Sequence, residues 1–202
     1  FGARPVPPNL GAFDARTEQG WYVAGQTAAV VSTSKRLGFV GDMITPESVR
    51  AINAFTRGAQ SVEPSTKVEV RWLGFWFDYN TSRTFHYKPV FAGPASAETS
   101  YFAEEYAAAL LIDAGADVIA HTGETRRVNR MVEQAGPMFK SDGVTPLRVH
   151  TFASHNRLGY QDGSTHQPMK TTIGSVYWNW TPVYSRLFED LAADKWTPFD
   201  IN

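Results

Sequence analysis

The chain has 202 residues, of which 43% are hydrophobic and 19% are charged, enough to fill the core of one α/β domain. The formal net charge is −1 and the basic residues are scattered, which argues against nucleic acid or an anionic membrane surface as the main partner. The sequence contains no cysteine, which excludes disulfides, thiolate catalysis and cysteine-based zinc sites.

Helices and strands are predicted to alternate along the chain. A helix is expected over 14–33, with Asp14 as its N-cap and with Gly25 marking close approach to a neighbouring strand. A second helix begins after Thr45, with Pro46 at its first position. The other expected elements are strands at 37–41, 67–74, 117–120, 148–152 and 171–177, and helices at 98–114, 126–134 and 182–193. This alternation predicts an α/β fold with a mainly parallel, Rossmann-like sheet and helices on both faces.

Two connections are longer than such a fold requires. Residues 79–97 are rich in aromatic residues, proline and glycine, and we expect a surface excursion with a hairpin through 84–91. Residues 154–170 form a second polar loop.

Aromatic and polar side chains follow two of the predicted strands. Phe75, Trp76 and Asp78 come after one strand, and His121 and Thr122 end another. Open α/β sheets bind ligands beyond the carboxyl ends of their strands. Rings supply flat apolar faces and the polar groups supply directional hydrogen bonds, so the pattern predicts a cleft for a planar, polar ligand.

Each of these residues also has a purely structural interpretation. Trp76 could be core, Asp78 could cap a loop, and His121 could be a satisfied buried histidine. Trp178 and Trp180 could pack at a hinge, whereas the amide of Asn179 between them can read the edge of a base.

Catalytic and metal-binding interpretations find little support. We interpret Glu104, Glu105 and Asp113 as a solvated helix face and a cap, because nothing in the sequence indicates burial of a paired-carboxylate site. The spacing of three candidate metal ligands, His155, Asp162 and His166, matches no standard pattern. Phosphate-binding G-x-G-x-x-G and nucleophile G-x-S-x-G motifs are absent. No catalytic residue, metal or cofactor is therefore expected, although an enzyme acting on a small metabolite stays an alternative that turnover would reveal.

The order and spacing of several segments are more specific than any one of them. These segments are 21–25, 37–41, 52–59, 76–78, 113–122 and 175–184, with Lys195 and Trp196 trailing. Together they resemble the basic membrane protein family of solute-binding proteins, the purine nucleoside receptor type. The resemblance implies one lobe of a type I periplasmic binding protein, which closes on its ligand and performs no chemistry.

The resemblance also implies a division of the chain and a set of contacts. Residues 1–13 would be an incoming crossover, 14–170 the second ligand-binding lobe, and 171–202 the return strand and helix toward a first lobe. Ligand-binding residues would be Phe75, Trp76, Asp78, His121, Thr122, Ser154, Trp178, Asn179 and Trp180. The apolar stripe of helix 182–193 would be covered by the first lobe or another chain.

The implied function is capture of a purine nucleoside or nucleobase-like ligand for an ABC importer. The protein would be periplasmic or on the cell surface, anchored by lipid through sequence before Phe1, with the permease as partner. The family's acidic ribose contact is replaced by Ala153-Ser-His-Asn156, so a free base fits as well as a nucleoside. A sensory domain of the same ancestry, signalling instead of transporting, is the alternative.

Overall fold

The chain forms two compact units. The computed structural model describes residues 9–76, 78–80, 82–153 and 167–201. The larger unit is Thr17–Tyr177, and the smaller unit joins Phe1–Arg16 to Trp178–Asn202. The boundaries expected at 13 and 170 stay a proposal, and β10 (Thr172–Ser175) lies in the sheet of the larger unit.

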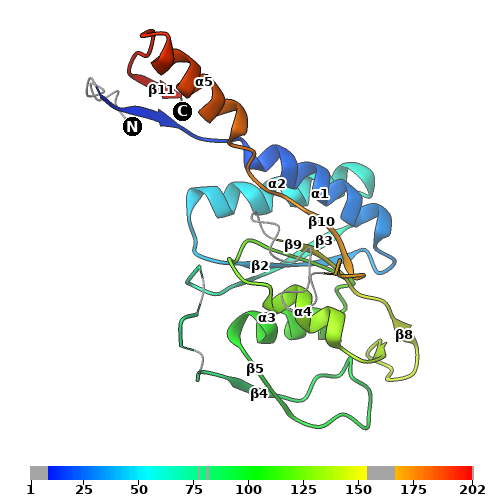
Figure 1. The fold of residues 1–202 in the computed structure, drawn as a ribbon. Coiled ribbons are helices and arrows are strands. Elements are labelled where there is room, and N and C mark those ends of the chain that lie inside the picture. Colours follow the sequence, from blue (N-terminus) through cyan, green and yellow to red (C-terminus); the bar gives the residue numbers. More distant parts are fainter. Residues whose placement is uncertain (1–8, 77, 81, 154–166, 202) are drawn as a thin grey trace. The chain divides into compact units, whose positions relative to one another are not determined.

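A five-stranded parallel sheet forms the centre of the larger unit (Figure 1). Its other strands are β2 (Arg36–Gly41), β3 (Lys67–Trp72), β6 (Val118–His121) and β9 (His150–Ala153). The spatial order is β10-β9-β6-β2-β3, and neighbouring strands in it pair in parallel. The predicted α/β class is confirmed. Strand order reverses between β2 and β6, which is the switch point where open sheets of this kind bind ligands.

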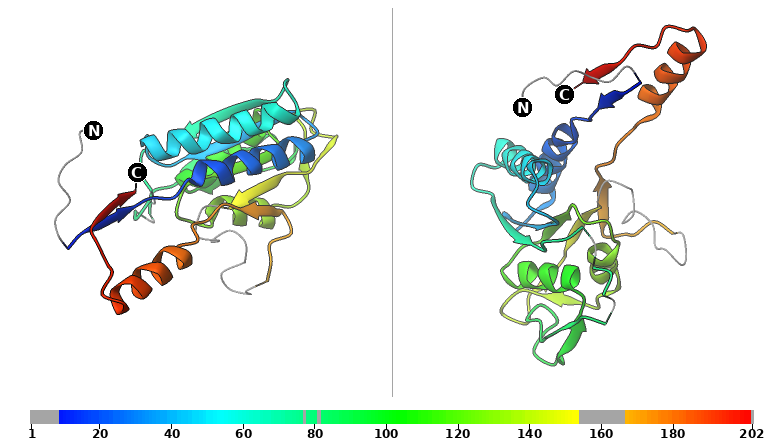
Figure 2. Two further views of the ribbon diagram at one scale, coloured as in Figure 1. Left: turned by 90° about the horizontal axis from the view of Figure 1, so that it is seen from above. Right: turned by 90° about the vertical axis from the view of Figure 1, so that its left-hand side faces the viewer.

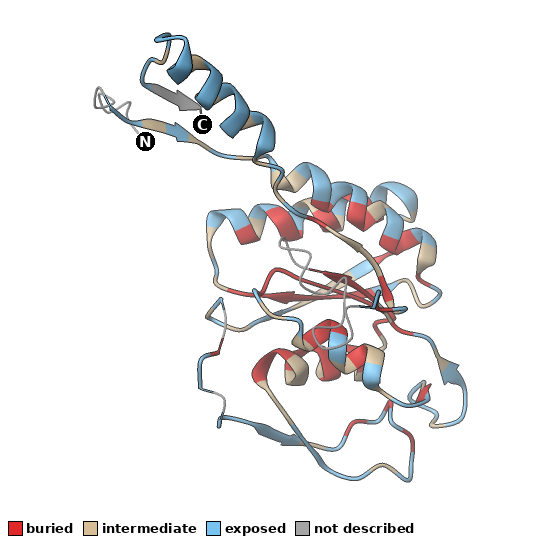
Figure 3. Cartoon of the chain, viewed as in Figure 1, coloured by how far each residue is buried: buried red, intermediate tan, exposed pale blue. Residues whose placement is uncertain are grey.

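Helices cover both faces of this sheet (Figures 1 and 2). Helices α1 (Thr17–Val31) and α2 (Pro46–Val62) pack on one face, and α3 (Ala103–Asp113) and α4 (Arg127–Gln134) pack on the other. Side chains alternate along β2, so Phe39 joins the core under α1 and α2 whereas Val40 joins the core under α3 and α4. Figure 3 shows the buried residues concentrated in the strands and on the helix faces that meet them.

Glycines allow α1 and α2 to cross in direct backbone contact. A Cβ atom built on Gly25 would lie 2.0 Å from the carbonyl oxygen of Phe55, and one built on Gly58 would lie 2.0 Å from that of Tyr22. The expectation that Gly25 faces a strand is wrong, because its neighbour is a helix. A glycine inside a helix indicates a close approach but does not identify the element that approaches.

The starts of α1 and α2 agree only partly with those predicted from the sequence. The Oγ1 atom of Thr45 accepts a hydrogen bond from the backbone N–H of Ser48, which confirms the expected N-cap of α2. Helix α1 begins at Thr17, so Asp14 is not its N-cap; the carboxylate of Asp14 accepts a hydrogen bond from the N–H of Ala15.

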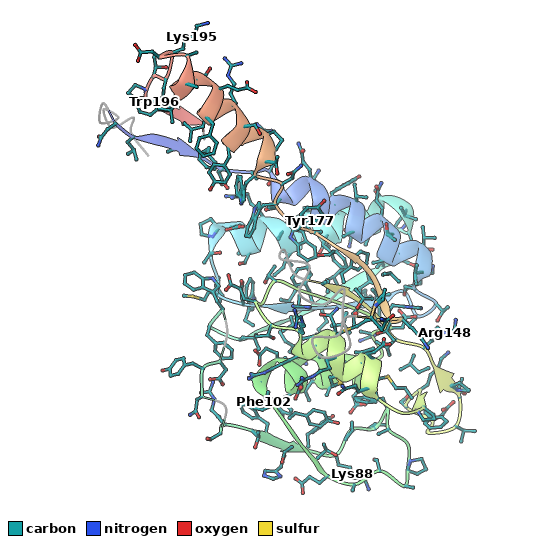
Figure 4. The ribbon with its side chains drawn as sticks, viewed as in Figure 1. Lys88, Phe102, Arg148, Tyr177, Lys195 and Trp196 are labelled. Atoms are coloured by element: carbon teal, nitrogen blue, oxygen red, sulfur yellow. The ribbon has the colours of Figure 1, made fainter. Side chains whose placement is uncertain are left out.

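The excursion after β3 carries a short antiparallel pair. Strand β4 (Phe85–Tyr87) pairs with β5 (Thr99–Tyr101), so the hairpin expected within 84–91 is wrong. Asp113 anchors the segment by accepting hydrogen bonds from Tyr87 Oη at 2.5 Å and from the N–H groups of Val90 and Phe91 at 2.8 and 2.7 Å. Lys88, which follows Tyr87 in the sequence of this segment, is labelled in Figure 4. Asp113 therefore holds the excursion rather than capping its own helix.

Two small elements complete the larger unit, and the smaller unit has its own sheet. Strands β7 (Met138–Phe139) and β8 (Pro146–Leu147) form a hairpin. In the smaller unit β1 (Gly11–Phe13) pairs in parallel with β11 (Phe199–Ile201), beside α5 (Thr181–Ala192). The sequence predicts none of these four strands, because runs of two or three residues carry no readable period.

The apolar stripe of α5 is only partly covered within the smaller unit, where Val183 and Leu187 are half-buried. Phe188 is 67% exposed and Leu191 is 52% exposed, and no residue of α5 is buried among those described. The expectation that a first lobe or another chain covers the stripe stays a prediction.

Candidate functional site

Asp42 joins three loops where the strand order reverses. Its N–H donates to Thr122 Oγ1 at 3.1 Å, and its carbonyl oxygen accepts from the N–H of Gly74 at 2.9 Å. Its carboxylate accepts from Ser48 Oγ at 2.6 Å, near the start of α2. The loops after β2, β3 and β6 are thus held together at the carboxyl edge of the sheet. Sequence reasoning missed Asp42, although its place directly after the strand at 37–41 is a usable signal.

Trp76 lies at this edge of the sheet and is about half exposed. Its carbonyl oxygen accepts a hydrogen bond from the N–H of Glu124 at 3.1 Å, which joins the loop after β3 to the loop after β6. The residue is 52% exposed, so it does not belong to the core. An exposed indole on a loop whose backbone is already held can act as a surface for stacking. Binding of a flat ligand then costs little conformational entropy of the loop.

Asp78 and Arg83 form an ion pair in the segment that follows Trp76. Asp78 is buried, and its carboxylate accepts from the N–H of Asn80 at 2.9 Å and from Arg83 Nε and Nη2 at 3.2 and 3.0 Å. The guanidinium carbon of Arg83 lies 5.7 Å from the ring centroid of Phe75, which is partly buried. Asp78 therefore orients an arginine that sequence reasoning missed, because Arg83 lies in the excursion.

His121 belongs to a buried network of hydrogen bonds. Its Nε2 atom lies 2.6 Å from Asn129 Oδ1, and the amide nitrogen of Asn129 donates to Thr151 Oγ1 at 2.8 Å and to Thr172 Oγ1 at 3.2 Å. In this arrangement the amide oxygen of Asn129 faces the histidine, and because an amide oxygen can only accept, Nε2 is the donor. The network links β6, α4, β9 and β10 and fixes the imidazole at the edge of the sheet.

The remaining expected ligand contacts divide between the two units. Thr122 is buried in the larger unit, and its hydroxyl braces Asp42 as described. Ser154 and the candidate metal ligands His155, Asp162 and His166 lie outside the described residues. The other three belong to the smaller unit: Trp178, Asn179 and Trp180.

These three residues directly precede α5. The rings of Trp178 and Trp180 stack with centroids 6.1 Å apart, and Phe13 packs edge-on against Trp180 at 5.3 Å. The side-chain oxygen of Asn179 accepts from the N–H of Thr181 at 3.3 Å, so it satisfies one free donor of the helix. Their contact with a ligand stays a prediction.

The two glutamates at the start of α3 have structural partners. Glu104 is buried and pairs with Arg127 Nη1 at 3.0 Å, and that guanidinium lies 4.0 Å from the ring centroid of Phe102, labelled in Figure 4. The expectation that Glu104 belongs to a solvated face is wrong. Burial raises the pKa of Glu105, whose carboxylate accepts from the N–H of Phe102. Among the described residues no group of three His, Cys, Asp or Glu side chains could hold a metal ion.

Residues 4–88 match the Bmp family model, described as an ABC transporter substrate-binding protein, PnrA-like. The predicted family resemblance is confirmed. Over 188 residues the chain is 29% identical to the putative ABC transporter glucose-binding protein TsgA13 of Haloferax volcanii, covering 93% of this chain and 38% of that protein. Over 121 residues it is 36% identical to the purine-binding protein BAB2_0673 of Brucella abortus, covering 59% of this chain and 28% of that protein. The chain therefore spans less than half the length of these two relatives.

Solved structures share the fold. An ABC transporter solute-binding protein from Conexibacter woesei superposes with a TM-score of 0.59 at 17% identity, over 97% of this chain and 52% of that chain. A transcriptional activator of the comK gene from Bacillus halodurans gives 0.61 at 14% identity, over 96% and 54%. At these identities the likeness shows the fold alone. The Bmp match is to a family of solute-binding proteins, not to a class of enzymes.

Proposed function

We propose that this chain is the ligand-binding lobe of an extracytoplasmic solute-binding protein that captures a purine nucleoside or nucleobase for an ABC importer. The Bmp match and the purine-binding relative support this function. The observation that carries it is Trp76, an exposed indole on a loop braced at the switch point of the sheet. The implied partner is the permease, and the implied location is the periplasm or the cell surface, with a lipid anchor. Among the described residues no helix has the length and apolar character to cross a bilayer.

The hydrogen bonds between the loops after β2, β3 and β6 prepare this edge of the sheet for binding a ligand. Asp42, Thr122 and Glu124 hold three loops in place before a ligand arrives, so binding need not order them. Stacking on the indole contributes about 0.5–1.5 kcal/mol beyond the burial of its area. A second lobe would close over the ligand and add contacts available only in the closed state.

The two curated relatives differ in the ligand that their names give. An indole face accepts a flat heterocycle and also the apolar face of a sugar, so Trp76 alone does not separate purine from glucose. The ion pair of Asp78 and Arg83, in the segment that follows Trp76, favours a ligand with in-plane donors and acceptors, as a purine has.

Calorimetric titration of the complete protein with inosine, adenosine, hypoxanthine, adenine and D-glucose tests the proposal. Purine binding is expected, with glucose silent. Binding of glucose without any purine would overturn the purine assignment. Binding of none of the five would overturn the whole proposal.

The variant Trp76→Ala tests the role of the indole. Affinity should fall several-fold, because the stacked face is lost, while the melting temperature without ligand stays near that of the wild type. Tyr79→Ala is the matched control: its ring lies in the same segment, is 86% exposed, and should leave both quantities unchanged. A large loss of stability in Trp76→Ala would show that the indole is part of the core.

A further inference from the structure

The excursion after β3 brings an arginine back to the candidate site. Arg83 lies within the segment 79–97, which exceeds the few residues that a βα connection normally uses. Its guanidinium returns to Asp78 and to the ring of Phe75, the residue directly before Trp76. The long connection therefore places a cation over the ring of Phe75, one residue before the indole of Trp76.

The arginine is held on one side and open on the other. Asp78 engages Nε and Nη2 through a single carboxylate oxygen, and that carboxylate is nearly buried, with 6% of its side chain exposed. The Arg83 side chain is 51% exposed. In the part of the chain that the structure describes, Nη1 has no hydrogen-bond partner. A guanidinium has five N–H donors in a rigid plane, so this edge presents a fixed pair of donors to solvent.

We propose that Arg83 determines specificity by selecting 6-oxopurines over 6-aminopurines, an inference that rests on the proposed function. Two neighbouring acceptors, O6 and N7, lie on one edge of hypoxanthine and guanine, and a paired arginine edge matches them. Adenine has an amino group beside N7, and this amino group is a donor. It would face an N–H donor of the guanidinium, and two donors cannot form a hydrogen bond with each other. Inosine and hypoxanthine are therefore ligands that this site prefers, and adenosine and adenine are disfavoured.

Asp78 and Phe75 act here as positioning residues. The carboxylate fixes the plane of the guanidinium, and the ring beneath it limits rotation of the side chain. An ammonium group is a point charge without a planar donor edge, so lysine cannot reproduce the selection even though it retains the charge.

The test is the ratio of dissociation constants for adenosine and inosine, measured by calorimetry on the complete protein. The wild type should bind inosine on the order of tenfold more tightly, the discrimination typical of a bidentate arginine contact. Arg83→Gln and Arg83→Lys should both lose the ratio through weaker inosine binding, with adenosine little changed. The matched control is Arg71→Gln, an exposed arginine of β3 paired with Glu69, which should keep the ratio.

Each result decides the inference. A wild type that binds both nucleosides equally, or a preference that survives in Arg83→Gln, would overturn the role of Arg83 and leave the purine proposal standing. If neither nucleoside binds, the same ratio is measured with adenine and hypoxanthine, and absence of binding to all four would overturn the purine proposal itself. Melting temperatures show whether the two Arg83 variants are folded. If Arg83→Gln is unfolded, Arg83→Lys still tests the inference, because it keeps a cation beside Asp78.

Discussion

The variant Gly25→Ala should destabilise the larger unit, because the added methyl group would force α1 and α2 apart. The new Cβ would lie 2.0 Å from the carbonyl oxygen of Phe55 and 2.9 Å from the backbone nitrogen of Ala59. Both atoms belong to the backbone of α2, which cannot rotate away as a side chain can. Normal contacts of a carbon begin at about 3.5 Å, so the helices must separate by roughly 1 Å or more.

Two opposing contributions set the size of the effect. Alanine is favoured over glycine inside a helix by about 1 kcal/mol. Overpacking a well-filled core costs about 1–3 kcal/mol, and occasionally more. The clash here is with backbone and disturbs packing around the buried Trp21 and Phe55, so the cost belongs at or above the upper end. A net loss of about 2 kcal/mol is expected, which lowers the melting temperature by roughly 4–8 °C in a chain of this size.

Thermal unfolding followed by circular dichroism measures the change. Gly58→Ala should behave similarly, and the double variant should lose less than the sum, because one separation of the helices relieves both clashes. Gly136→Ala is the control, since no atom lies within 4 Å of the position that its Cβ would take and its φ is not positive. A Gly25→Ala protein as stable as the wild type would refute the backbone contact.

Three further predictions concern buried polar groups and the two-lobed binding scheme. Burial would raise the pKa of Asp117, but hydrogen bonds from Ser32 and from the N–H groups of residues 33 and 34 lower it overall. Its contribution to stability is therefore complete above its unfolded pKa of about 4 and is lost as the pH falls through the lower folded value. Urea unfolding should show this loss below about pH 4, and Asp117→Asn should lack that part of the pH dependence; identical profiles would contradict the assignment. Asn129→Ala leaves His121 and two buried threonines with fewer partners and should cost about 1–3 kcal/mol in urea unfolding, whereas the exposed Asn53→Ala should cost little. The 202-residue chain alone should bind purines more weakly than the complete protein, and equal affinities in parallel titrations would argue against closure by a second lobe.

Much of the architecture follows from local patterns in the sequence. Apolar residues at helical and strand periods predict the alternating elements of the larger unit, because each element must bury one face. Thr45 followed by Pro46 likewise marks the start of α2. An N-cap is readable from the sequence because its side chain bonds only to the backbone of the first helical turn. The sequence also draws attention to Trp76, as a large aromatic residue in the loop that follows a predicted strand.

The tertiary structure decides which partners those residues meet. Glu104 is buried because Arg127, 23 positions later, reaches it; a pattern on α3 alone predicts a solvated face. Asp113 binds the excursion, and Gly25 meets a helix instead of a strand, for the same reason. Asp42 meets Thr122 and Gly74 only because parallel pairing places three loop ends side by side, and Arg83 meets Asp78 only because the excursion folds back. Periodicity is set within a few residues, whereas ion pairs, crossings and loop clusters depend on the order of strands in space, which no short segment contains.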